Sequence, residues 1–172
     1  MALREIIQET QAALRIDPKA AAAIFSADSR QIEGVRSEAR IRQFTVTIDE
    51  PPTLGGTDAG PNPVELVLAA LAACQEITYR VYATALGVPL DSVSVSLQGN
   101  LDLRGFFAVS DDVRPGFTGV RGTVTLKSSA PAAELEKLKA IVDAHCPVLD
   151  IFKNPVPVEL ALNAAPVAAA AE

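Results

Sequence analysis

The sequence is poor in the residues that cross-link small proteins or bind metal ions. Its 172 residues include two cysteines, one histidine and no tryptophan. Two cysteines cannot build the disulfide framework of a small secreted protein, and a domain of this length does not need one. No Cys-x-x-Cys or His-x-x-x-His spacing supplies the ligands of a zinc site. We therefore expect a protein of the reducing cytoplasm that has no metal ion and no other cofactor.

The sequence also lacks an excess of basic residues and a long hydrophobic run. Its 15 Lys and Arg against 21 Asp and Glu give a net charge of −6, which argues against nucleic acid or an anionic membrane as a partner. The most apolar stretch, residues 64–73, contains Glu65 and is too short to span a bilayer. Glu5 and Glu9 lie where a signal peptide would be apolar, so we do not expect secretion.

The sequence does contain a regular succession of helix and strand patterns. Apolar residues at helical spacing predict an amphipathic helix over residues 2–16, which ends before Asp17-Pro18. Alternating apolar and polar residues predict strands within residues 22–48, in the segments AAIFSA, QIEGVRSEARI and RQFTVTID. Four prolines and three glycines in residues 51–63 predict a structured loop.

A long helix is predicted after this loop. Asn62 is a good N-cap, Pro63 occupies the favoured first helical position, and Gly87 ends the pattern. Two alternating segments follow, residues 92–103 and residues 117–128, and we expect them to pair as an antiparallel hairpin.

The C-terminal part repeats the change from helix to strand. Apolar residues at spacings of three and four predict a second helix over residues 131–145, which ends at Cys146-Pro147. Residues 156–163, VPVELALN, predict a last short strand.

This order of elements is typical of one α+β domain rather than a regular βαβ array. We expect an N-terminal helical segment in residues 1–18, the α+β domain in residues 19–163 and a disordered tail in residues 164–172.

Cys74 lies near the middle of the predicted long helix. It shares one helical stripe with small and apolar residues, Val67, Ala70, Leu71, Ile77, Thr78 and Val81, so we expect it to face the interior. The other stripe carries Glu65, Gln75, Glu76 and Tyr79, and Glu76 is expected to pair with Arg80 at the surface. Free cysteine is among the most buried residue types, so a packed core residue is one interpretation of Cys74.

Cys146 favours a second interpretation. It lies where a helix ends at proline, so its backbone is exposed and can move. One cysteine at mid-helix and one at a helix end suit an attacking thiol and a resolving thiol. A mid-helix position offers Cys74 no helix end, so its thiolate would need a side-chain cation.

The segments LGGTDAGPNPVELVLAALAACQEITY and AHCPVLDIF together resemble the OsmC/Ohr family, the osmotically induced and organic hydroperoxide resistance proteins. The resemblance covers residues 26–162. Its most specific parts are the Gly-Gly loop, the Asn-Pro helix start, Ala-Ala-Cys at mid-helix and Cys-Pro after the second helix. It implies an OsmC-like intertwined homodimer, in which each subunit is a curved antiparallel sheet around two helices and the long cysteine-bearing helix is central.

The resemblance also implies an activity. The better-known members of the family are thiol peroxidases that reduce organic hydroperoxides, which places the peroxidatic thiol at Cys74 and the resolving thiol at Cys146. An external dithiol then resets the enzyme. An arginine on an early strand normally holds the thiolate, and counting back from the LGG loop puts it at Arg36, with Arg40 and Arg42 as alternatives on the same strand face.

One position departs from the family pattern. The peroxidases carry a glutamate two residues after the Asn of Asn-Pro, where this chain has Val64. Glu65 is one residue further on and projects to nearly the opposite helix face from Cys74. The alternative function is therefore a non-catalytic binding or interaction protein of the same fold, in which Cys74 is packed and inert.

Overall fold

The computed structural model describes residues 2–164 of the chain. The strands are β1 (Asp28–Glu33), β2 (Arg36–Ile41), β3 (Phe44–Ile48), β4 (Ser92–Asn100) and β5 (Gly119–Lys127). The helices are α1 (Leu3–Ile16), α2 (Pro63–Leu86), α3 (Leu103–Phe106), α4 (Ala132–His145) and α5 (Pro147–Lys153), with short 3-10 turns η1 (Pro18–Ala21) and η2 (Pro52–Leu54).

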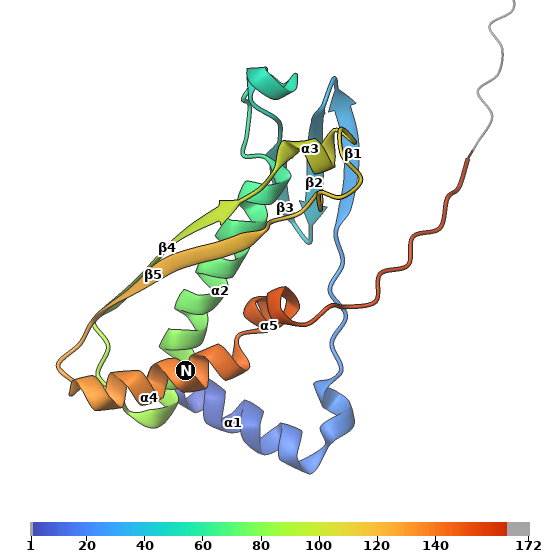
Figure 1. Ribbon diagram of the computed structural model, residues 1–172. Coiled ribbons are helices and arrows are strands. Elements are labelled where there is room, and N and C mark those ends of the chain that lie inside the picture. Colours follow the sequence, from blue (N-terminus) through green and yellow to red (C-terminus); the bar gives the residue numbers. More distant parts are fainter. Residues whose placement is uncertain (1, 165–172) are drawn as a thin grey trace, which may run out of the picture.

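The strands form two separate antiparallel sheets, one in the order β1-β2-β3 and one of the pair β4-β5. Figure 1 shows α2 in the middle of the molecule, with the three-stranded sheet near its first turns and helices α1 and α4 near its last turns. The prediction of an α+β fold is confirmed. No helix in residues 2–164 is long and apolar enough to cross a membrane.

The three-stranded sheet is built around β2, which pairs with both of its neighbours. Gly34 makes the turn between β1 and β2 at φ +55°, a backbone conformation that side chains disfavour. The prediction of an earlier strand in AAIFSA is wrong, because this segment has no regular structure and leaves Ile24 and Phe25 exposed. Within the described part of the chain its backbone has no neighbouring strand to pair with, and alternation alone does not form a strand.

One buried carboxylate holds the loop between β3 and α2. Asp49 is 2% exposed and accepts hydrogen bonds from the hydroxyl and N–H of Thr57 and from the N–H groups of Glu50 and Ala59. These donors, the Thr57 hydroxyl foremost, hold the pKa of Asp49 well below its usual range. The loop therefore delivers the chain to Asn62 in one conformation.

Helix α2 begins and ends as predicted. The Asn62 side chain accepts from the Glu65 N–H at 2.9 Å, and the Glu65 carboxylate accepts from the Asn62 N–H at 2.8 Å. This reciprocal pair is a capping box, which satisfies two otherwise free backbone donors. Gly87 ends the helix at φ +76°.

The hydrophobic core lies where α2, α4 and the β4-β5 hairpin meet. Tyr79 and Val142 are 0% exposed and Leu138 is 1% exposed, and Val93 and Val124 of the hairpin pack against them. Burial of a side chain of this size stabilises the fold by roughly 1.5–3 kcal/mol. This cluster therefore fixes the position of α4 relative to α2.

Two polar side chains of α2 hold the edge of the hairpin. A Glu76 carboxylate oxygen accepts from the Val95 N–H at 3.2 Å. The Arg80 guanidinium donates to the carbonyl oxygens of Leu90 and Asp91 at 2.5 and 3.2 Å. The predicted surface pair of Glu76 with Arg80 is therefore wrong: Glu76 binds an N–H at the edge of β4, and Arg80 binds the carbonyls of the two residues before β4.

The C-terminal part differs most from the sequence-based prediction. After α4 the chain extends for one residue, Cys146, and restarts as α5, which was not predicted although Pro147 occupies its first position. The predicted strand over residues 156–163 is wrong: the segment has no regular structure and runs away from the body of the molecule (Figure 1). Its alternating apolar side chains are exposed, with Leu160 at 92% and Leu162 at 93%.

Pro157 cannot donate a backbone hydrogen bond, and residues 2–164 supply no strand beside this segment. The predicted tail, residues 164–172, lies outside the described residues except for its first member. The division into segments 1–18, 19–163 and 164–172 stays a prediction.

We expect Asp49→Asn to lower the urea midpoint of unfolding at pH 7, because a neutral amide replaces a carboxylate that accepts several hydrogen bonds. Folding lowers the pKa of Asp49, so its contribution to stability is present above the unfolded pKa, about 3.9, and is lost as the pH falls towards the folded value. The gap between the variant and the wild type should therefore narrow below about pH 3.9.

The matched control is Asp112→Asn, which changes an exposed loop carboxylate and should unfold like the wild type at every pH. Equal midpoints for Asp49→Asn and the wild type at pH 7 would show that Asp49 does not hold the loop.

Candidate active site

Two thiols meet where α2 passes the junction of α4 and α5. Cys74 lies in the middle of α2, Cys146 joins α4 to α5, and their Sγ atoms are 3.4 Å apart. Both thiols are free. A disulfide bond is about 2 Å long, so a small local movement would let the two sulfurs form one.

The two thiols differ in their access to solvent. Cys146 is 1% exposed and belongs to the buried core, whereas Cys74 is half-buried. Cys74 is therefore the more accessible of the two residues, and the Cys146 sulfur lies 3.4 Å from its sulfur. This order is the one that an attacking thiol and a resolving thiol require.

The surroundings of Cys74 act on its pKa in opposite directions. Burial raises the pKa of the Cys74 thiol most, and the neighbouring Cys146 thiol raises it further. The N–H of Val148 and the Thr78 hydroxyl, which donates to the Cys74 carbonyl oxygen at 2.7 Å, lower it, and the net effect is a raised pKa. Within a single chain the thiol form is therefore favoured.

The contribution of Val148 corrects one expectation. A mid-helix cysteine was expected to have no helix end near it, but Val148 lies in the first turn of α5, where backbone N–H groups have no partner within the helix. The sequence hid this contact, because α5 itself was not predicted.

The inner face of α2 is rotated from its predicted position. Gln75 and Tyr79 were expected to face outward, but they are 5% and 0% exposed. Ile77 and Val67 were placed on the inner stripe and are instead 65% and 43% exposed. Cys74 lies at the border between these faces, which explains why its sulfur is only half-buried.

Arg36 lies at the start of β2 and pairs with Glu33 at 2.9 Å. Arg40 is exposed on the same strand, and Arg42 lies in the following turn with its guanidinium over the Phe44 ring. Among the groups of the described chain that shift the pKa of Cys74, none is an arginine. The assignment of Arg36 to the thiolate stays a prediction.

The position of the family glutamate is Val64, and the next residue does not replace it. The Glu65 carboxylate is engaged in the capping box with Asn62. It therefore stabilises the start of α2. Within residues 2–164, no group of three or more His, Cys, Asp or Glu side chains could hold a metal ion.

A family model for OsmC-like proteins matches residues 56–161 of the chain. Among solved structures, an OsmC-like protein from Mycoplasma pneumoniae is 19% identical at a TM-score of 0.67 and covers 77% of this chain and 89% of its own. An organic hydroperoxide resistance protein OsmC from Legionella pneumophila is 23% identical at a TM-score of 0.59, with coverage of 77% and 92%.

An organic hydroperoxide resistance protein from Elizabethkingia anophelis has a similar fold, at 14% identity and a TM-score of 0.58, with coverage of 77% and 91%. No curated protein sequence matches the chain. At such low identities the solved structures show a shared fold and no more. The family model matches more than half of the chain, and the matched residues include the Asn62-Pro63 start of α2 and Cys74. The protein therefore belongs to the OsmC-like family.

Proposed function

We propose that this protein is a thiol peroxidase that reduces organic hydroperoxides through Cys74 and Cys146. The observation that carries the proposal is the 3.4 Å separation of the two Sγ atoms, with one thiol half-exposed and the other buried. Organic hydroperoxide resistance proteins among the structures of similar fold support the same reaction class.

The bonds that form and break in the reaction involve these two thiols, the hydroperoxide and an external reductant. The Cys74 thiolate attacks one peroxide oxygen, the O–O bond breaks, and the other oxygen leaves as an alcohol after it takes up a proton. Cys74 is then a sulfenic acid. The Cys146 sulfur attacks it, water leaves, and a Cys74–Cys146 disulfide forms. An external dithiol reduces this disulfide by exchange and is itself oxidised.

The surroundings of Cys74 favour alkyl or lipid hydroperoxides over hydrogen peroxide. Leu71 lies one turn before Cys74 on α2, and Val148 lies beside the sulfur. An apolar approach of this kind binds the alkyl part of a substrate and offers little to a small polar peroxide.

A cation near Cys74 is still required, because burial raises the pKa of its thiol and only the thiolate attacks peroxides. We assign this role to Arg36 from a second copy of the chain, as part of an intertwined homodimer. The free edges of the two small sheets and the unpaired segment 156–163 would allow strands of two copies to pair.

The exposed surface supports this homodimer. The chain has 13043 Å² of accessible surface, whereas a compact monomer of 18.0 kDa has about 8,000 Å². Helix α1 buries none of its residues, and the segments around Phe25 and Leu160 expose large apolar side chains. Apolar surface of this extent is typical of an interface.

The raised pKa of Cys74 favours one alternative, a binding protein of the same fold with an inert thiol. In that case organic hydroperoxide would leave both cysteines unchanged, since a protonated thiol is a poor nucleophile.

We expect one equivalent of cumene hydroperoxide to consume both thiols of each chain and to form a Cys74–Cys146 disulfide, which peptide mapping under native alkylation detects. Cys74→Ser should leave Cys146 unreacted, because Cys146 is buried. Cys146→Ser should react once and stop at the sulfenic acid, which dimedone labels. Two free cysteines in the treated wild type would overturn the two-thiol mechanism.

Light scattering should give a mass of twice 18.0 kDa at micromolar concentration. Deletion of residues 155–172 should weaken the dimer, because it removes the unpaired alternating segment, whereas deletion of residues 165–172 alone should leave the dimer intact. A stable wild-type monomer would contradict the proposal that Arg36 of one copy stabilises the Cys74 thiolate of the other.

A further inference from the structure

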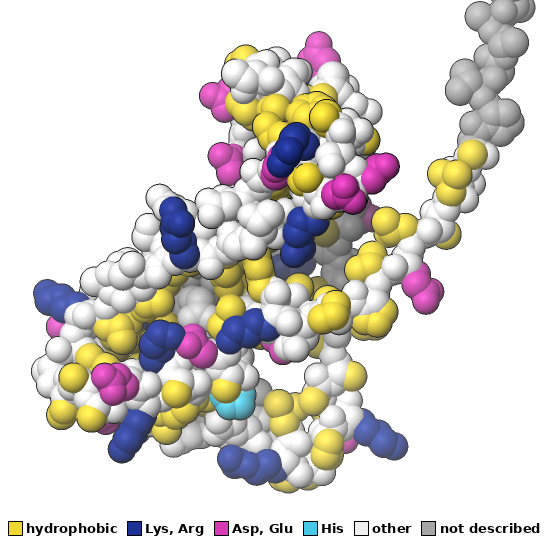
Figure 2. Space-filling view, viewed as in Figure 1, with side chains coloured by type: hydrophobic (Ala, Val, Ile, Leu, Met, Phe, Trp, Pro, Cys, Tyr) yellow, Lys and Arg dark blue, Asp and Glu magenta, His cyan; other side chains and the backbone are white. Residues whose placement is uncertain are grey.

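A second feature of the structure lies beside the thiol pair and is not explained by it. A cavity of about 810 Å³ opens between the β4-β5 hairpin, α2, α4 and α5. Figure 2 shows a hollow in this region with hydrophobic side chains inside it and Lys and Arg side chains around it. Its volume lies in the range of cavities that bind small molecules.

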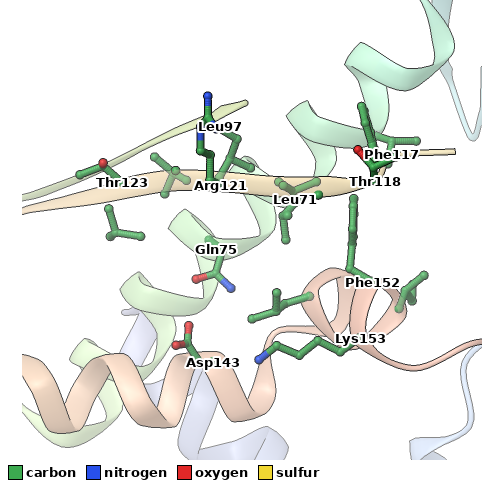
Figure 3. A pocket seen from close by; sticks show the side chains of 18 of the residues that line it. Leu71, Gln75, Leu97, Phe117, Thr118, Arg121, Thr123, Asp143, Phe152 and Lys153 are labelled. Atoms are coloured by element: carbon green, nitrogen blue, oxygen red, sulfur yellow. The ribbon is translucent and has the colours of Figure 1, made fainter. Parts of the chain in front are cut away.

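The inner part of the cavity is apolar on several sides. Leu71 comes from α2, Leu97 from β4, Phe117 from the loop before β5, and Leu149 and Phe152 from α5. The Phe152 ring rises from α5 towards Phe117 and Thr118 (Figure 3). These walls suit the hydrocarbon body of a ligand.

Gln75 supplies a polar group at the opposite end of the cavity. It is 5% exposed, and its Nε2 is buried without a hydrogen-bond partner. Figure 3 shows its amide directed towards Asp143, across the cavity from the Phe152 ring. A buried donor without a partner is costly, so this amide favours a ligand with an acceptor atom at that end.

The charges at this end are positive on balance. Asp143 forms an ion pair with Lys139 and is thereby compensated. Lys153 extends its amine towards the same point (Figure 3), and within residues 2–164 it forms no ion pair. Arg114 and Arg121 also line the cavity, and Figure 3 shows the Arg121 guanidinium directed away from Gln75. In a chain with a net charge of −6, this local excess of cations is complementary to an anion.

We propose that this cavity binds a carboxylic acid with an apolar body. The carboxylate accepts hydrogen bonds from Gln75 Nε2 and from the Lys153 amine, and the hydrocarbon part lies among the apolar side chains of α2, β4 and α5. This site is separate from the thiol pair: both cysteines lie outside the cavity lining, and Val148 of α5 contacts Cys74 while Leu149 and Phe152 face the cavity.

Calorimetric titration with decanoate, well below its micelle concentration, tests the proposal on the full chain. We expect one decanoate per chain and at least about tenfold weaker binding of decylammonium, which carries the opposite charge on the same hydrocarbon. Gln75→Leu and Lys153→Glu should each weaken decanoate binding about tenfold or more. Gln75→Leu should fold as well as the wild type, because it removes an unpartnered amide.

The matched control is Lys137→Glu, which makes the same charge change on α4 at an exposed position outside the cavity lining and should bind decanoate like the wild type. The double variant Cys74→Ser, Cys146→Ser should also bind normally, so the test does not depend on peroxidase activity. No saturable binding, as expected if a second copy fills the cavity, would overturn the proposal, as would equal binding of decanoate and decylammonium or normal binding by both Gln75→Leu and Lys153→Glu.

Discussion

The packing of α2 against α4 is the interaction on which the rest of the structure depends. Tyr79 of α2 and Leu138 and Val142 of α4 are almost completely buried against each other. This contact fixes the position in space of the C-terminal end of α4. It thereby brings the Cys146 sulfur to within 3.4 Å of the Cys74 sulfur. The same packing places α5 so that one side of it contacts the thiol pair and the other lines the cavity. Both proposed sites therefore depend on one hydrophobic core.

Within residues 2–164 of a single chain, the proposed thiol site lacks the cation that the Cys74 thiolate needs. Burial raises the pKa of Cys74, and the N–H of Val148 offsets this only in part. The chain likewise leaves its two sheets separate and residues 156–163 unpaired. A second copy could supply a strand to pair with the free sheet edges and a cation to lower the pKa of Cys74.

The sequence predicted the elements whose signals are local. The cap at Asn62, the glycine at Gly87 and the apolar spacing of α4 depend on neighbouring residues, and these elements were found where expected. The strand over residues 156–163 was not found, because a strand depends on a partner that local alternation does not reveal. The rotation of α2 was missed for the same reason. Gln75 is buried by elements far from it in the sequence, and the pattern of residues along one helix does not show which elements will pack against it. Cys74 and Cys146 were singled out by their scarcity, but their separation depends on the tertiary packing.

The pKa of Cys74 in the assembled protein tests the central claim most directly. It can be measured from the pH dependence of iodoacetamide reactivity in Cys146→Ser, where Cys74 is the only thiol. We expect its pKa to lie below the ordinary cysteine value of about 8.5, and to rise when Arg36→Ala is added but not when Arg40→Ala is added. A pKa of about 9 or above that Arg36→Ala leaves unchanged would show that Cys74 is a buried, inert thiol.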